Sequence, residues 1–261
     1  MKVSEVIIHL ESKGSWVNWG KTRDVVLFGD TDKEITKIGV CWVASIPAIE
    51  QAIESRVNFI ISHENLFYLE GSCLDKGIKD SVSRKKELLS LHGITVYRCH
   101  DVWDKIPNVG VADTWAKDIG FEFIERDVTS FNSYAYVNQL PLKEVAEKVV
   151  NALKPNGINS VQVIGDITRV IERIAIGTGA ATDIFSMLEF NPDVFVVSDD
   201  GIKNWIEVQW AIDNDLCLII VNHACCEISG LKELKYYLEK EFVDTNVEYL
   251  DEGFDFTTIV V

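Results

Sequence analysis

Apolar runs of strand length alternate with helical patterns along nearly the whole chain. The runs at residues 57–61 and 216–221 are apolar almost without a break, which is typical of parallel strands that are covered on both faces. Residues 142–153 show the other pattern, because Val145, Ala146 and Val149 recur at helical spacing and would form one apolar face. We therefore expect helices that pack against sheets.

The same pattern predicts an element for most of the sequence. The expected strands cover residues 25–28, 38–42, 57–61, 94–97, 133–137, 161–164, 170–176, 194–197, 216–221 and about 247–250. The expected helices cover residues 3–13, 46–55, 79–92, 109–119, 142–153, 180–190, 202–212 and 227–242.

This order of elements predicts an α/β fold. Strands that alternate with helices favour mainly parallel sheets with both faces covered. Two such series follow one another, and the polar stretch 125–132 lacks any periodicity. We expect two interlinked α/β domains with mixed, mainly parallel sheets. The first would contain residues 1–127 together with about 228–261, and the second would contain residues 128–227.

The negative net charge of the chain disfavours nucleic acids as partners. Acidic residues outnumber basic ones by 41 to 25, so the formal net charge is −16, and such a surface repels the phosphates of nucleic acid. No apolar run is long enough to span a membrane, and the N-terminus lacks the features of a signal peptide. We expect a cytoplasmic protein with no nucleic-acid or membrane partner, and an acidic surface that concentrates cations.

Three short motifs, each led by a histidine, follow predicted strands. The first is His63-Glu64, the second runs from His100 to Asp104, and the third runs from His223 to Glu227. Ligands of open α/β sheets bind at the carboxyl ends of strands. If a helix begins at each of the last two strand ends, residues four apart share one helix face. The mixture of imidazole and carboxylate donors suits Zn²⁺, Mn²⁺ or Fe²⁺ better than Ca²⁺ or Mg²⁺.

Each motif taken alone has a simpler explanation. A lone histidine near a strand end is more often structural or exposed than a metal ligand. A histidine and a glutamate four residues apart on a helix often lie on its solvent-exposed face. Gly177-Thr178-Gly179 would follow a strand, and it could bind an anion or form only a tight turn. Residues 198–201 end another strand and are explained by a turn with a helix cap. The six cysteines form no CxxC pair and are interpreted as buried thiols.

The motifs resemble those of the proteins named for NGG-one-interacting factor three, which are also known as GTP cyclohydrolase 1 type 2 homologues. Members carry a pair of histidines after a strand, then HxxxD, then GHxxxE near the C-terminus, and the order and internal gaps are the same here. The resemblance also covers residues 16–30 and 174–179. It implies two linked α/β domains, a dinuclear metal centre in the cleft between them and a homohexamer.

The resemblance also implies roles for individual residues. It assigns the metal ligands to His63, Glu64, Asp104, His223 and Glu227, and it places His100 beside the metal ions, either as a residue that supports the ligands or as a group that transfers protons. Glu64 departs from the family, because a second histidine is common at that position. An oxygen donor with a negative charge favours a harder metal ion. Cys225 and Cys226 also depart from it, and Cys226 is either an additional soft ligand or a packed thiol.

Two functions fit these residues. The first is a metal-dependent hydrolase in which two divalent ions activate water, with a nucleotide, a phosphoester or another small metabolite as substrate. The family name suggests a reaction of the GTP cyclohydrolase type. The second is a non-enzymatic metal-binding assembly or regulatory partner. An open coordination position would favour the enzyme, and a closed cluster would favour the second function.

Overall fold

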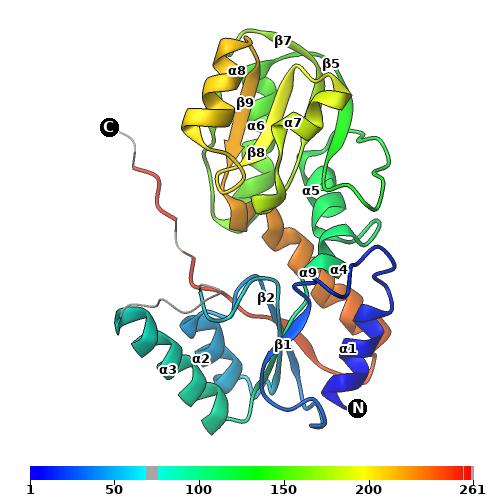
Figure 1. Cartoon of the computed structure of the whole chain (residues 1–261), viewed down its shortest axis with the longest axis vertical. Coiled ribbons are helices and arrows are strands. Elements are labelled where there is room, and N and C mark those ends of the chain that lie inside the picture. The colour runs from blue at the N-terminus through cyan, green and yellow to red at the C-terminus, as the bar shows by residue number, and fades with distance from the viewer. Residues whose placement is uncertain (69–75, 255, 260–261) are drawn as a thin grey trace. The chain divides into compact units, whose positions relative to one another are not determined.

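The structure is a computed structural model that describes residues 1–68, 76–254 and 256–259 (Figure 1). The chain forms two compact units. The first contains Met1–Ile106 and Leu231–Phe254, and the second contains Pro107–Gly230 and the segment after residue 254. Cys73 lies outside the described residues. None of the helices within the described ranges combines the length and the apolar character that crossing a membrane requires.

The first unit contains a five-stranded sheet with the order β1-β4-β3-β2-β10. Strands β10, β2, β3 and β4 are parallel, and β1 pairs with β4 in the antiparallel direction at one edge. The strands are β1 (Val25–Phe28), β2 (Ile38–Cys41), β3 (Phe59–Ser62), β4 (Thr95–Arg98) and β10 (Val247–Tyr249). The helices are α1 (Val3–Glu11), α2 (Ile46–Glu54), α3 (Lys76–Leu91), α4 (Asp101–Lys105) and the C-terminal part of α9 (His223–Glu241).

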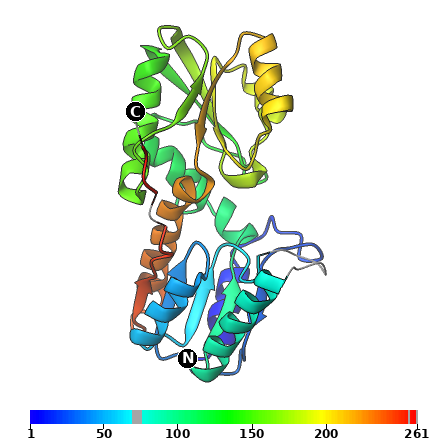
Figure 2. The same ribbon diagram turned by 90° about the vertical axis from the view of Figure 1, so that its left-hand side faces the viewer.

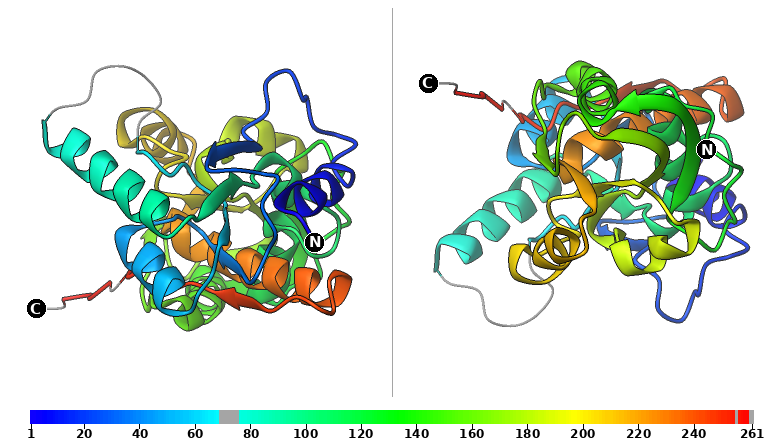
Figure 3. Two further views of the ribbon diagram at one scale, coloured as in Figure 1. Left: turned by 90° about the horizontal axis from the view of Figure 1, so that it is seen from below. Right: turned by 90° about the horizontal axis from the view of Figure 1, so that it is seen from above.

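Helices cover both faces of this first sheet. On one face, Ile49 of α2 and Leu89 of α3 share a core cluster with Ile60 of β3. On the other face lie α1 and the later part of α9 (Figures 1 and 3). The described residues of β3 and β4 are all buried. The expectation of strands covered on both faces is therefore met at the centre of the sheet.

The second unit contains another five-stranded sheet, with the order β5-β7-β8-β9-β6. Strands β7, β8 and β9 are parallel, and the edge strands β5 and β6 are antiparallel to their neighbours. The strands are β5 (Ser133–Pro141), β6 (Gln162–Ile164), β7 (Val170–Ile176), β8 (Val194–Ser198) and β9 (Cys217–Val221). The α-helices are α5 (Val111–Ile119), α6 (Leu142–Leu153), α7 (Ile184–Met187), α8 (Gln209–Asp213) and the first residues of α9.

Two core clusters lie on opposite faces of the second sheet. Val149 of α6 packs in the cluster that contains Ile174 and Ile219. Ala211 of α8 packs in the other, with Phe195. Figure 2 shows α6 in green and α8 in yellow on opposite sides of this sheet. The α/β fold class with mixed, mainly parallel sheets is confirmed, since each sheet has a parallel centre and at least one antiparallel edge.

Two predicted helices are interrupted, and a polar side chain explains the first interruption. Within 180–190, Asp183 is extended and its carboxylate accepts the N–H of Phe185, so α7 begins only at Ile184. Short 3₁₀ turns flank this helix at Gly179–Ala181 and Leu188–Phe190. Within 202–212, the first turn is a π-helix at Asn204–Val208, and α8 follows it. By contrast, α9 begins four residues before its predicted start, at His223.

A buried glutamate ties the C-terminal segment to the end of β2. Oε1 of Glu252 accepts the N–H of Trp42 at 2.5 Å and the hydroxyl of Tyr249 at 2.6 Å. The backbone oxygen of Glu252 accepts the hydroxyl of Ser45 at 2.8 Å. Burial raises the pKa of Glu252, although the hydrogen bonds from Tyr249 and Trp42 oppose the increase. The side chain therefore stabilises the turn after β2 mainly as a hydrogen-bond acceptor.

Replacing Glu252 with alanine is expected to destabilise the protein, because the substitution removes a buried acceptor from the Trp42 N–H. The expected loss is about 1–3 kcal/mol in the free energy of unfolding, measured by urea denaturation. Glu252→Gln is the matched control, because its side-chain oxygen still accepts hydrogen bonds, and its loss should be clearly smaller. Equal losses in the two variants would contradict this role.

Candidate metal centre

The pairing of β3 with β4 places two imidazoles side by side. The two strands are parallel, with Ser62 opposite Arg98, and the N–H of Cys99 donates to the oxygen of Ser62 at 2.9 Å. His63 and His100 follow directly, and their rings stack with centroids 4.4 Å apart and an interplanar angle of 6°. Nδ1 of His63 donates to the carbonyl oxygen of Cys99 at 3.2 Å, so Nε2 is the ring nitrogen that faces the neighbouring acidic groups.

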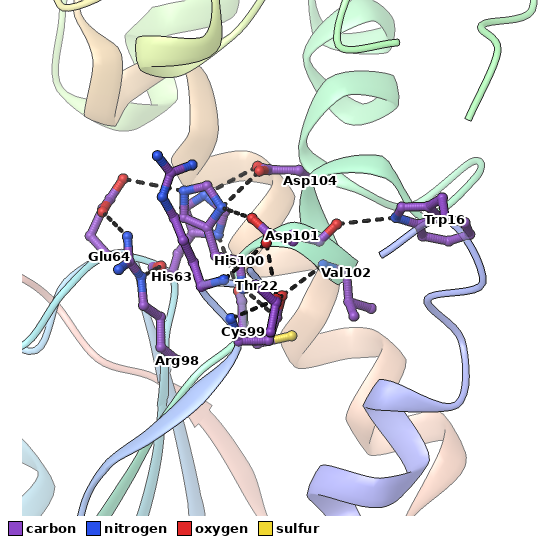
Figure 4. A network of polar contacts seen from close by, with 12 residues as sticks. Trp16, Thr22, His63, Glu64, Arg98, Cys99, His100, Asp101, Val102 and Asp104 are labelled. Atoms are coloured by element: carbon purple, nitrogen blue, oxygen red, sulfur yellow. Dashed lines mark hydrogen bonds and ion pairs between the residues drawn. The ribbon is translucent and has the colours of Figure 1, made fainter. Parts of the chain in front are cut away.

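Helix α4 places the carboxylate of Asp104 beside these two imidazoles. The N–H of Asp104 donates to the carbonyl oxygen of His100 at 2.8 Å, so the two residues lie one helical turn apart. The Asp104 oxygens lie 2.9 Å from Nδ1 of His100 and 3.3 Å from Nε2 of His63. His63 is fully buried, and Asp104 is 3% exposed. Figure 4 shows this convergence, which matches the helix-face spacing expected from the sequence.

Asp24 holds the start of α4 in place. Its carboxylate accepts the N–H groups of His100 at 2.7 Å and Val102 at 3.3 Å, and the hydroxyl of Thr22 at 2.9 Å. Asp24 is 4% exposed, and burial raises its pKa. Sequence reasoning missed this residue, because it lies 76 positions before His100 and belongs to no motif.

Glu64 is held by a buried arginine. Nη2 of Arg98 donates to Oε2 of Glu64 at 2.9 Å, and Nε of Arg98 donates to the carbonyl oxygen of His63 at 3.2 Å. Oε1 of Glu64 lies 3.7 Å from Nε2 of His100. The backbone N–H groups of His63 and Glu64 both donate to the carbonyl oxygen of Trp42. Main-chain and side-chain contacts therefore both orient the first motif.

Opposite charges control the protonation of this cluster. Burial alone would raise the pKa of Glu64, but the neighbouring imidazoles and Arg98 outweigh it and lower the pKa to about 2. Burial likewise opposes ionisation of Asp104, yet His100 and His63 hold the pKa of that carboxyl well below its usual range. For His100, burial disfavours the charged form, but Asp104, Asp101 and Glu64 raise its pKa well above the ordinary value. At neutral pH both carboxylates are ionised and His100 carries a proton.

These residues fit a divalent metal ion. His63, His100 and Asp104 each offer a ligand atom, and the three atoms lie within 4.8 Å of one another. Imidazole nitrogens together with a carboxylate oxygen suit Zn²⁺, Mn²⁺ or Fe²⁺. The resemblance placed His100 beside the ions, whereas the structure brings it into the same group of potential ligand atoms. Buried carboxylates without a bound cation also require positive partners, which here are Arg98 and protonated His100.

In the second unit, α9 brings the third motif together. Nε2 of His223 lies 3.1 Å from a carboxylate oxygen of Glu227, and Nδ1 donates to Asp200 at 2.8 Å. The N–H of His223 donates to Asp199 at 2.9 Å. Asp199 and Asp200 follow β8 and were interpreted from the sequence only as part of a turn with a helix cap. In the sequence, only their position after a predicted strand indicated that Asp199 and Asp200 could contact His223.

Gly179 allows the turn after β7 to approach this pair closely. Its φ is +57°, and a Cβ there would lie 2.3 Å from Oε1 of Glu227 and 2.7 Å from Nε2 of His223. Any side chain at this position would therefore collide with both residues. These contacts explain the glycine as part of a tight turn, and anion binding by Gly177-Thr178-Gly179 stays a prediction.

The two neighbouring cysteines pack inside the second unit. Cys225 and Cys226 are 0% and 1% exposed and belong to the core cluster of α6. The thiol of Cys226 donates to the carbonyl oxygen of His223 at 3.1 Å. Burial is the main factor that raises the pKa of this thiol well above its ordinary value. These observations favour the packed thiol over an additional metal ligand.

The structure thus brings the predicted site residues together within each unit. His63, Glu64, His100 and Asp104 meet in the first unit, and His223 meets Glu227 in the second. The assignment of five of these residues to one pair of metal ions stays a prediction.

Comparisons with known proteins identify the family of this chain. The family model for Duf34/NIF3 (NGG1p interacting factor 3) matches residues 1–252. A "GTP cyclohydrolase 1 type 2 homolog" of Clostridium perfringens is 27% identical over 76% of this chain and 78% of its own length. One of Nostoc sp. is 23% identical over 87% of each.

Solved structures share the fold. The hypothetical protein SA1388 of Staphylococcus aureus has a TM-score of 0.81 and 23% identity, with 99% of each chain covered. A Bacillus cereus protein related to NIF3 has a TM-score of 0.81 and 12% identity, over 100% of this chain and 99% of the other. Because the family model spans nearly all of the sequence, this chain belongs to the Duf34/NIF3 (NGG1p interacting factor 3) family.

Proposed function

We propose that this protein is a dinuclear-metal hydrolase that acts on a nucleotide or another phosphoester. Two divalent ions, Zn²⁺, Mn²⁺ or Fe²⁺, would be held by side chains of the three motifs, namely His63, Glu64, Asp104, His223 and Glu227. The observation that carries the proposal is the buried pair of proposed ligands His63 and Asp104, with Nε2 of His63 3.3 Å from a carboxylate oxygen of Asp104. The name of the Clostridium perfringens relative supports a reaction of the cyclohydrolase type.

The histidines proposed as ligands are oriented by their other ring nitrogen. Nδ1 of His63 donates to a backbone carbonyl, and Nδ1 of His223 donates to Asp200, so Nε2 of each ring can bind a cation. Such contacts select one tautomer and one ring orientation, which strengthens metal binding. In both units, therefore, the proposed ligand histidine carries its proton on Nδ1 and leaves Nε2 to bind a cation.

His100 is the proposed proton carrier. Its ring lies 2.9 Å from Asp104 and 3.1 Å from Asp101, and these carboxylates stabilise its protonated form. A protonated imidazole beside the reacting bond can give its proton to a leaving group and then accept one from water. When bound, the divalent ions would supply Lewis-acid chemistry that lowers the pKa of water and polarises the bond under attack.

One prediction of the proposed function concerns metal content and turnover. The purified wild-type protein should bind two Zn²⁺, Mn²⁺ or Fe²⁺ ions per chain, measured by elemental analysis, and should hydrolyse a member of a panel of nucleotides and phosphoesters. His223→Ala and His63→Ala should each weaken metal binding by at least about tenfold, because each removes a ligand. The exposed His92 belongs to no motif, so His92→Ala is the control and should behave like the wild type.

The outcomes separate the proposal from its alternative. Metal binding without turnover of any substrate, with each of the three ions supplied, would favour a non-enzymatic metal-binding protein. A folded wild-type protein that binds none of these ions would contradict both functions. Circular dichroism of the two alanine variants shows whether a loss of metal reflects a lost ligand or a lost fold.

Another prediction separates proton transfer from metal binding at His100. In His100→Gln the hydrolysis rate should fall by about 10²–10⁴-fold, the usual contribution of general acid–base catalysis, while the metal content stays at the wild-type level. Steady-state kinetics and elemental analysis on the same preparation provide both measurements. If the metal is lost as well, His100 is a ligand and its proposed role is wrong.

A further inference from the structure

The two carboxylate oxygens of Glu64 face different partners. Oε2 accepts a hydrogen bond from Nη2 of Arg98 at 2.9 Å, whereas Oε1 lies 3.7 Å from Nε2 of His100. Figure 4 shows dashed contacts from the carboxylate to the guanidinium group of Arg98 and to an imidazole. Of the two oxygens, Oε1 is therefore the one directed toward the buried histidines.

Arg98 is well placed to keep this arrangement. It is the last residue of β4, and its side chain is only 6% exposed. Its Nε donates to the carbonyl oxygen of His63 at 3.2 Å while Nη2 holds Glu64. The guanidinium group is planar and rigid, so these two contacts hold the backbone of His63 and the carboxylate of Glu64 in one relative orientation. A lysine could not reproduce this fork.

We propose that Arg98 determines how Glu64 binds a divalent cation, because it occupies Oε2 and presents Oε1 as a single-oxygen donor. The inference rests on the metal binding proposed above. Ca²⁺ commonly takes both oxygens of a carboxylate, whereas transition-metal ions accept one oxygen within a set that includes imidazoles. The pair formed by Glu64 and Arg98 therefore selects Mn²⁺, Fe²⁺ or Zn²⁺ against Ca²⁺.

The test measures selectivity rather than activity. Affinities of the full-length protein for Mn²⁺ and for Ca²⁺ are determined by competition with a metal-binding dye. Arg98→Gln releases Oε2, and the ratio of Ca²⁺ to Mn²⁺ affinity should rise at least about threefold, within the range for contacting residues. Arg84 forms an exposed ion pair with Glu50, so Arg84→Gln is the matched control and should leave the ratio unchanged.

A double-mutant cycle tests whether the effect passes through Glu64. In a Glu64→His background no carboxylate remains to be released, so adding Arg98→Gln should not change the ratio. A shift that persists in this background would overturn the proposal. An equal change in both affinities in the single variant would also overturn it, because it would mean that Arg98 has only a structural role.

Arg98→Lys keeps the test decisive if Arg98→Gln does not fold, as judged by circular dichroism. Lysine keeps the charge but has one nitrogen, so it cannot hold His63 and Glu64 in the same way. The ratio should then rise in the same direction, and an unchanged ratio would overturn the inference. Absence of metal binding by the wild type would instead overturn the proposed function, so the two failures are distinguishable.

Discussion

The parallel pairing of β3 with β4 is the constraint on which the imidazole cluster depends. With Ser62 opposite Arg98, the segments that leave the two strands bring the rings of His63 and His100 together in a stack. Both strands are buried along their whole length, so a shift of one residue would exchange the side chains that face each core. The packing of the sheet therefore fixes the position of the histidines before any ligand is present.

The cluster balances negative charge within the protein interior. Glu64 and Asp104 are ionised at neutral pH, because Arg98 and protonated His100 offset the cost of burying them. Asp24 adds a further carboxyl group nearby, with a pKa that burial raises. A bound divalent cation would add a further positive partner for Glu64 and Asp104.

Most of the architecture could be predicted from the sequence, because buried parallel strands are continuously apolar and the helices between them are periodic. The residues proposed as ligands were also visible, since each motif follows a strand end. The interruption of the helix predicted at 180–190 could not be predicted. Its apolar residues have helical spacing, and the helix is broken by a local hydrogen bond from the backbone to Asp183, whose own backbone is extended. The supporting residues Asp24 and Arg98 were hidden for another reason. Their contacts join positions far apart in the chain, which a periodic pattern does not reveal.

The two histidines proposed as ligands are oriented by partners that differ in their access to water. Nδ1 of His63 is held by a main-chain carbonyl within a fully buried site. Nδ1 of His223 is held by Asp200, whose side chain is 66% exposed. Water competes for hydrogen bonds to an exposed carboxylate but cannot reach a buried carbonyl. The hydrogen bond that orients the ring of His223 is therefore exchangeable with water, whereas the one that orients the ring of His63 is not.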